Sequence, residues 1–75
     1  MNTKIQGYTI DTCYTADCGY ETAIWHDKLG SMVIVERYSN KEEAKIGHEK
    51  WVKYCKKRPK TAFSVQFNEE DVLRK

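Results

Sequence analysis

Cysteine and histidine are the residues of this 75-residue chain that could together hold a metal ion. The candidate ligands are Cys13, Cys18, His26, His48 and Cys55. Zinc sites usually combine two close pairs of ligands, with about two to four residues between the cysteines of a pair. Cys13 and Cys18 lie at the edge of that range, and the gap between His48 and Cys55 exceeds it. The spacing therefore predicts no metal site, and an odd number of cysteines suits free thiols in a reducing compartment.

His48 and the preceding Gly47 admit a catalytic and a structural interpretation. A histidine can act as a general acid or base, and Glu21 or Tyr38 would then orient its ring. The chain offers no nucleophile beside it and is short for a substrate pocket. We favour the structural interpretation, in which Gly47 permits close approach to a sheet and His48 hydrogen-bonds a neighbour there. We therefore predict no catalytic residues, no cofactor and no enzyme activity.

A basic cluster follows His48 along the chain and surrounds a tyrosine. Its cations could neutralise phosphates while the aromatic ring stacks on a base, as in a nucleic-acid interface. Cations at the end of a helix also complement the helix dipole and keep a small protein soluble, and an acidic protein partner is a third interpretation. The chain has a net charge of +2, but residues 41–60 carry +5 and residues 1–40 carry −2. The predicted binding residues of the cluster are Lys53, Tyr54, Lys56, Lys57, Arg58 and Lys60.

Trp25 is a further candidate contact residue. It belongs to a predicted strand over residues 20–26, where it shares a face with Glu21 and Ala23. Either this face is exposed with the tryptophan on it, or the sheet buries the ring on the side that Ile24 does not use. An exposed tryptophan would be a good anchor for a protein partner.

An amphipathic helix is predicted from Asn40 to about Lys57, and the basic cluster lies at its end. Ser39, with Glu42 three residues later, has the spacing of a capping box at the start of the helix, and Pro59 ends it. Apolar residues recur at helical spacing and predict the face that docks on a sheet, with Ile46 left on the solvent side. Trp51 is central in this face, which consists of Ala44, His48, Trp51, Val52 and Cys55.

The segments before the helix are predicted to be strands. Residues 5–12 have strand composition, whereas residues 13–19 have the composition of a loop. Residues 20–26 and 32–38 are expected to pair as an antiparallel hairpin, because a short loop with Gly30 joins them.

The segment after the helix predicts one more strand. Phe63, Val65 and Phe67 alternate with polar residues, as in a half-buried strand, and residues 68–75 are expected to form a short helix or a frayed tail. The predicted fold is a single α+β domain over residues 1–75. It consists of an antiparallel sheet of three to four strands with one amphipathic helix packed on one face, in the order β-β-β-α-β.

The length of the chain bounds its stability and its partners. A domain of this size builds a core that is only just sufficient, and a homodimer would complete it. No run of 18 apolar residues occurs, and the first residues lack the apolar stretch and cleavage site of a signal peptide. We expect a cytoplasmic protein without a membrane partner.

Short motifs follow one another in a fixed order along roughly residues 7 to 54. They are a threonine-containing strand, an aspartate and glycine loop, an aromatic-Glu-Thr strand, then Arg-Tyr, a Ser/Thr cap, Glu-Ala and Gly-His. In this order and spacing the chain resembles a group of small phage-encoded proteins of unknown function. The matching positions are Thr12, Asp17, Gly19, Tyr20, Glu21, Thr22, Arg37, Tyr38, Ser39, Glu43, Ala44, Gly47, His48 and Val52.

The resemblance implies a phage or prophage origin and expression in the cytoplasm of a bacterial host, with no established activity. The chain departs from the pattern in its shorter loop before Tyr20 and in the basic stretch and strand after Tyr54. Together with the small size and uneven charge, this predicts a non-enzymatic phage accessory protein that binds a host protein, for example as an inhibitor of host defence. The alternative is a nucleic-acid-binding module that uses the basic end of the helix.

Overall fold

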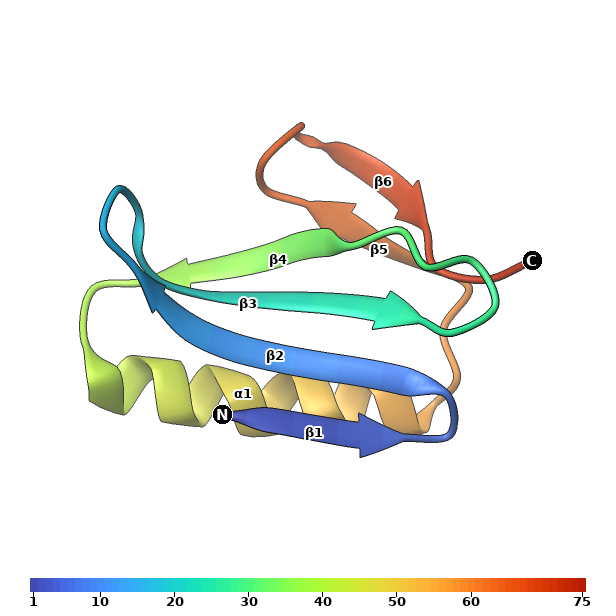
Figure 1. Cartoon of the computed structure of the whole chain (residues 1–75), viewed down its shortest axis with the longest axis horizontal. Coiled ribbons are helices and arrows are strands. Elements are labelled where there is room, and N and C mark those ends of the chain that lie inside the picture. Colours follow the sequence, from blue (N-terminus) through green and yellow to red (C-terminus); the bar gives the residue numbers. More distant parts are fainter.

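The computed structural model describes residues 1–75 and contains six strands and one helix. The first four strands form an antiparallel sheet in which each strand pairs with the next along the chain, and the last two form a separate hairpin (Figure 1). The predicted α+β fold with one helix on an antiparallel sheet is confirmed. The elements are β1 (Asn2–Ile5), β2 (Tyr8–Thr15), β3 (Gly19–His26), β4 (Val33–Tyr38), α1 (Lys41–Lys56), β5 (Thr61–Ser64) and β6 (Glu69–Val72).

The single strand predicted over residues 5–12 was wrong, because a tight turn divides it into β1 and β2. Gln6 and Gly7 form this turn with φ values of 51° and 87°. Positive φ at both central residues matches the twist of a two-residue hairpin, and glycine adopts it without steric cost. The loop predicted over residues 13–19 was also too long, because β2 continues to Thr15 and only residues 16–18 form the turn.

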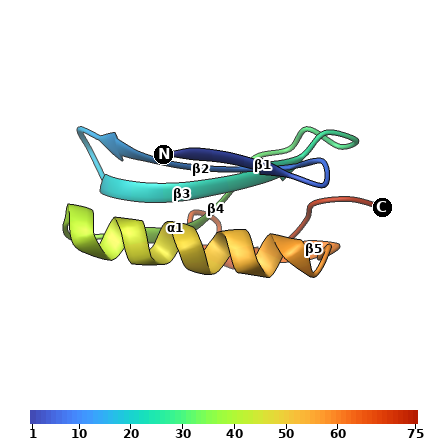
Figure 2. The same ribbon diagram turned by 90° about the horizontal axis from the view of Figure 1, so that it is seen from below.

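α1 lies across one face of the four-stranded sheet (Figure 2). The predicted docking face is confirmed in Ala44, His48 and Cys55, which are buried, whereas Trp51 is half-buried at the margin of the core. With 16 residues, α1 is neither long nor apolar enough to cross a membrane. The core cluster consists of Tyr8, Ile10, Ile24, Val33, Val35, Cys55, Ala62 and Leu73.

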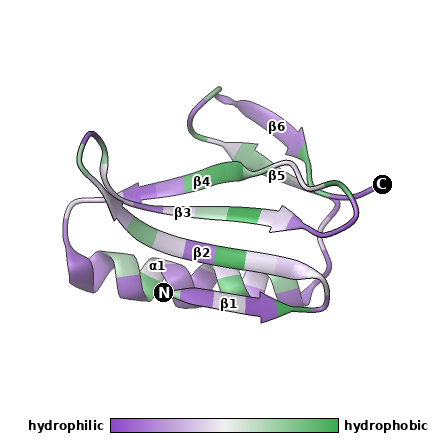
Figure 3. Ribbon diagram, in the orientation of Figure 1, coloured by the Kyte–Doolittle hydropathy of each residue, from purple (hydrophilic) through white to green (hydrophobic).

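β4 changes character along its length, as the hydropathy colours of Figure 3 show. Its first residues, Val33–Val35, are buried apolar side chains, and its last residues, Glu36–Tyr38, are polar and partly exposed. The Val65 N–H donates to the Ile34 carbonyl at 2.9 Å and so attaches the β5–β6 hairpin beside the apolar part of β4. The polar part of β4 remains at the open edge of the sheet.

The helix begins one residue later than predicted. Asn40, not Ser39, is the N-cap, and its side-chain oxygen accepts from the Glu43 N–H at 2.9 Å. The Glu43 carboxylate in turn accepts from the Ser39 N–H at 3.2 Å, so Glu42 has no part in the cap. Asparagine caps a helix as well as serine does, and the spacing could not choose between two overlapping pairs. The helix ends before Pro59, as predicted.

The strand after the helix buries the opposite face from the one predicted, which carried Phe63, Val65 and Phe67. Ala62 is buried on β5, whereas Phe63 and Phe67 are 43% and 64% exposed. A repeat of two residues gives the period of a strand but not the face that meets the core. The short helix or frayed tail predicted over residues 68–75 was also wrong, because Asn68 has a φ of 56° in a turn and the chain returns as β6, which pairs with β5.

Candidate functional site

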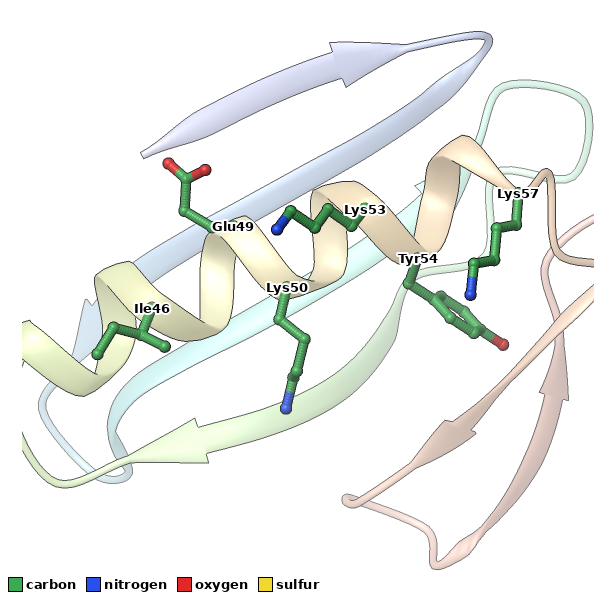
Figure 4. A pocket seen from close by; sticks show the side chains of 6 residues that line it. All are labelled: Ile46, Glu49, Lys50, Lys53, Tyr54 and Lys57. Atoms are coloured by element: carbon green, nitrogen blue, oxygen red, sulfur yellow. The ribbon is translucent and has the colours of Figure 1, made fainter.

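An open groove of about 670 Å³ runs along the outer flank of α1 (Figure 4). It contains three of the predicted binding residues, Lys53, Tyr54 and Lys57. Sequence reasoning missed the other site residues, although Ile46 stood out as the apolar residue on the polar side of the helix. The lining residues are Ile46, Glu49, Lys50, Lys53, Tyr54 and Lys57.

The groove combines one exposed apolar side chain with several cations. Ile46 is 72% exposed, Lys50 and Lys53 follow it on successive turns of α1, and Lys57 is the C-cap of the helix. Residues three or four positions apart lie on one side of a helix, so the four side chains form a continuous strip. Glu49 is the single carboxylate of the lining, which leaves the groove positively charged.

Tyr54 closes the groove on the side of the β5–β6 hairpin. Its hydroxyl donates to the Thr61 carbonyl at 2.7 Å, and its ring meets the Trp51 ring edge-on at a centroid distance of 5.1 Å. Burial raises the pKa of Tyr54, and the carboxylate of Glu70 adds to the effect, so the phenol stays neutral at pH 7. The ring is therefore held by contacts within the protein.

A second depression of about 350 Å³ continues the groove toward β4 and shares Ile46 and Lys50 with it. At its floor the Glu36 carboxylate accepts from Lys50 Nζ at 2.6 Å, from Trp51 Nε1 at 2.8 Å and from the Tyr38 hydroxyl at 3.1 Å. Desolvation opposes ionisation of Glu36, but these three hydrogen bonds outweigh it and lower the pKa of the carboxyl group. Glu36 is therefore an anion that accepts hydrogen bonds and donates none.

A chain of hydrogen bonds leads from Glu36 into the space between the sheet and α1. The Tyr38 hydroxyl lies 3.0 Å from Thr22 Oγ1, Thr22 Oγ1 lies 2.6 Å from Thr12 Oγ1, and Thr12 Oγ1 lies 2.6 Å from His48 Nδ1. Because Tyr38 donates its single proton to Glu36, its oxygen must accept from Thr22, and Thr22 must then accept from Thr12. The ionised carboxylate thereby sets the direction of the whole chain.

This direction also determines the tautomer of His48. Thr12 donates to Thr22, so its oxygen accepts from His48 Nδ1–H, and His48 Nε2 accepts from Thr3 Oγ1 at 2.9 Å. Burial lowers the pKa of His48 and keeps the ring neutral. The partners of His48 are thus threonines of β1 and β2, not Glu21 or Tyr38, and the predicted structural role is supported by a chain that links β1, β2, β3 and β4 to α1.

Gly47 provides the space for Tyr38. A β-carbon at Gly47 would lie closer than 3.0 Å to the Tyr38 hydroxyl and ring carbons, a distance that real β-carbons essentially never show. Tyr38 therefore passes under the helix only because residue 47 has no side chain. Burial, with a contribution from the Glu36 carboxylate, raises the pKa of Tyr38 to about 12.

The remaining predicted binding residues lie apart from the groove. Trp25 is half-buried on the face of β3 that α1 does not cover, where it pairs with Thr9 across the sheet. Lys56 and Lys60 are exposed but line no cavity, and Arg58 lines a different cavity at the end of the molecule. The basic cluster is therefore split among several surfaces.

The three cysteines do not come together. Cys13 and Cys18 are exposed, and Cys55 is buried in the core. Desolvation raises the pKa of the Cys13 thiol, and the carboxylates of Asp11 and Glu21 raise it further. Burial raises the pKa of Cys55 to about 11. No group of three histidine, cysteine, aspartate or glutamate side chains is arranged as metal ligands.

Comparison with known proteins gives no relative that could assign the groove a role: no family model, no curated protein and no solved structure matches this chain.

Proposed function

We propose that this protein is a non-enzymatic binding protein whose groove on α1 holds an acidic segment of a host protein. The observation that carries the proposal is the exposed Ile46, which lies among Lys50, Lys53 and Lys57. An apolar side chain in a concave surface can anchor a partner residue. Lys50 is paired with Glu36, whereas Lys53 and Lys57 form no salt bridge and can attract the carboxylates of a partner and orient its approach.

The same geometry favours a protein partner over a nucleic acid. A surface for single-stranded nucleic acid needs aromatic faces that bases can cover. Tyr54 is the aromatic residue of the groove, and its ring and hydroxyl are engaged by Trp51 and Thr61. Trp25 lies on the opposite face of the sheet from α1 and cannot join Tyr54 in a row of stacking residues.

The setting of this function rests on the resemblance to small phage proteins. In that setting the protein acts in the cytoplasm of a bacterial host and blocks a host protein by covering part of its surface, as an inhibitor of a defence system would. The depression beside Glu36 extends the contact area along the open edge of β4, where unpaired backbone groups can accept an added strand.

Affinity capture from bacterial lysate with three forms of the protein tests the proposal. The forms are wild type, Ile46→Asp and the control Met32→Asp, because Met32 is a 60% exposed apolar residue outside the groove. We expect an acidic protein that wild type and M32D retain equally and that I46D retains roughly tenfold less. Equal retention by all three forms, or no specific capture at any salt concentration, would overturn the proposal.

Nucleic-acid binding is the second candidate function, and the exposure of the basic cluster favours it. Lys53, Lys56, Lys57, Arg58 and Lys60 are all exposed. Affinity would then fall with salt at a log–log slope of about −0.7 per phosphate contacted on a single strand. A gel-shift assay at low salt tests this function, and the absence of any shift removes it.

A further inference from the structure

A cavity of about 310 Å³ lies at the end of the molecule where four segments meet. These are the β1–β2 turn, the end of β3, the residues after α1 and the C-terminal residues after β6, which gather at the right-hand end of Figure 1. No hydrophobic side chain lines the cavity. Four cations face one carboxylate in it, and the charged lining residues are Lys28, Arg58, Arg74, Lys75 and Asp27.

His26 contributes a hydrogen-bond donor to this cavity. The residue is only 7% exposed, and the Lys28 N–H donates to its Nδ1 at 3.2 Å. Because Nδ1 accepts, Nε2 carries a proton. Nε2 has no hydrogen-bond partner in the protein, and it is accessible, since no fully buried side-chain nitrogen or oxygen lacks a partner. It lies so close to Gly7 that a β-carbon there would come within 2.7 Å of it. The edge-on contact with the Tyr8 ring, at a centroid distance of 4.6 Å, fixes the orientation of the imidazole.

The guanidinium of Arg74 is held in place at the same cavity. Its Nε donates to the Tyr8 hydroxyl at 2.9 Å, and its Nη2 donates to the Arg58 carbonyl at 2.7 Å. The Tyr8 hydroxyl itself donates to the Pro59 carbonyl. These contacts orient the plane of the guanidinium and leave further N–H groups free to bind a ligand. A preoriented arginine loses less freedom on binding than a mobile one.

Arg58 occupies a backbone position at which glycine is the usual residue. Its φ of 56° lies in the left-handed region, directly after the end of α1. Helices commonly end on a glycine in this conformation, because other residues are strained there. The side chain of Arg58 lines the cavity from this strained backbone position. Residues with strained backbone conformations occur often at ligand sites.

We propose that this cavity binds a phosphate group, as free phosphate or as the terminal phosphate of a small organic molecule. A tetrahedral oxyanion offers several acceptor oxygens, which suit the preoriented guanidinium, the His26 Nε2–H and the surrounding cations. The absence of an apolar wall excludes an apolar ligand. None of these residues lines the groove on α1, so the proposal does not depend on the proposed function.

Titration of the protein with inorganic phosphate, followed by amide NMR at constant ionic strength, tests the proposal. We expect saturable shifts at Gly7, Lys28 and Arg58 and at Arg74 Nε–H. A parallel titration with glycerol phosphate distinguishes the sources: tighter binding of the ester indicates an organic phosphate, and equal or weaker binding indicates free phosphate.

Three variants make the test specific. Arg58→Gly removes the side chain and suits the left-handed backbone, so the fold is retained. Lys28→Gln removes a second cation, and Lys56→Gln removes one charge outside the cavity. We expect R58G and K28Q to weaken binding about tenfold, as the loss of a charge-assisted hydrogen bond does, and K56Q to leave it almost unchanged. Absence of saturable shifts, or equal weakening by all three variants, would overturn the proposal.

Discussion

Replacement of Gly47 by alanine tests the way in which α1 packs on the sheet. In an exposed helix interior this substitution stabilises a protein by about 1 kcal/mol, because alanine is the better helix former. Here the added β-carbon would overlap the Tyr38 hydroxyl and ring. Tyr38 would have to move away from both Thr22 and Glu36, to which it is hydrogen-bonded.

The size of the effect follows from three contributions. Overpacking costs about 1–3 kcal/mol, and the two hydrogen bonds of Tyr38 contribute about 1 kcal/mol each. After the gain in helix propensity is subtracted, G47A should destabilise the fold by about 2–4 kcal/mol. For a domain of this length, the lower end of that range already lowers Tm by roughly 8–16 °C.

Urea denaturation followed by circular dichroism gives the free energy of unfolding for the test. The matched control is a double-mutant cycle with Tyr38→Ala, which removes the side chain that the alanine would strike. In that background G47A should be neutral or stabilise the fold by up to about 1 kcal/mol, which gives a coupling energy of about 2–5 kcal/mol between the two sites. If G47A is as stable as wild type, or if the two substitutions are additive within about 0.5 kcal/mol, the packing argument fails.

Three further predictions follow from the cap, the histidine and the thiols. Asn40→Ala should lower the free energy of unfolding by about 1 kcal/mol, because the Asn40 side chain caps the helix. Ser39→Ala should lower it much less, because Ser39 contributes only its backbone N–H to the cap. Equal losses of the two variants in urea denaturation would contradict this assignment of the cap. The pKa of His48 in the folded protein lies below its usual 6.5, so the unfolded state binds the proton more readily. The neutral His48 therefore contributes its full stabilisation above pH 6.5, and this contribution is lost as the pH falls below 6.5 toward the pKa of the folded state. The urea midpoint should therefore drop more between pH 7 and pH 5 in wild type than in His48→Gln, and an equal drop would argue against this role of His48. With a thiol-reactive disulfide reagent, the two exposed cysteines should react before unfolding, although the raised pKa of Cys13 slows its reaction, and Cys55 should react only at the rate of unfolding. Reaction of all three thiols before unfolding would contradict the burial of Cys55.

Local patterns carried the prediction of the helix and of the central hairpin. The apolar stripe with Ala44 and Cys55 has the helical period, and Pro59 prevents continuation of the helix whatever the rest of the chain does. The pairing of β3 with β4 needed only a short loop between two strand-like segments. Such features act over a few residues, so the sequence is sufficient to recognise them.

Other features depended on contacts between distant segments. Two overlapping pairs of residues could each cap the helix, and the alternation around Phe63 fits either face of a strand. The buried side of β5 is decided by its docking beside β4, where Ala62 and Leu73 complete the core. The candidate site was only partly predicted for the same reason. Lys53, Tyr54 and Lys57 were recognised as a basic stretch, but the groove also needs Ile46 and Lys50 from earlier turns of α1.

The sequence by itself determined the end and the two-sided character of α1, the central hairpin before it and the uneven charge of the surface, because propensity and periodicity are properties of neighbouring residues. Only the tertiary structure decided which polar groups satisfy one another. The chain of hydrogen bonds from Glu36 through Tyr38 and His48 to Thr3 joins residues from four strands and the helix. Its members can be buried only because the fold brings them within hydrogen-bonding distance, since a buried polar group without a partner is unfavourable.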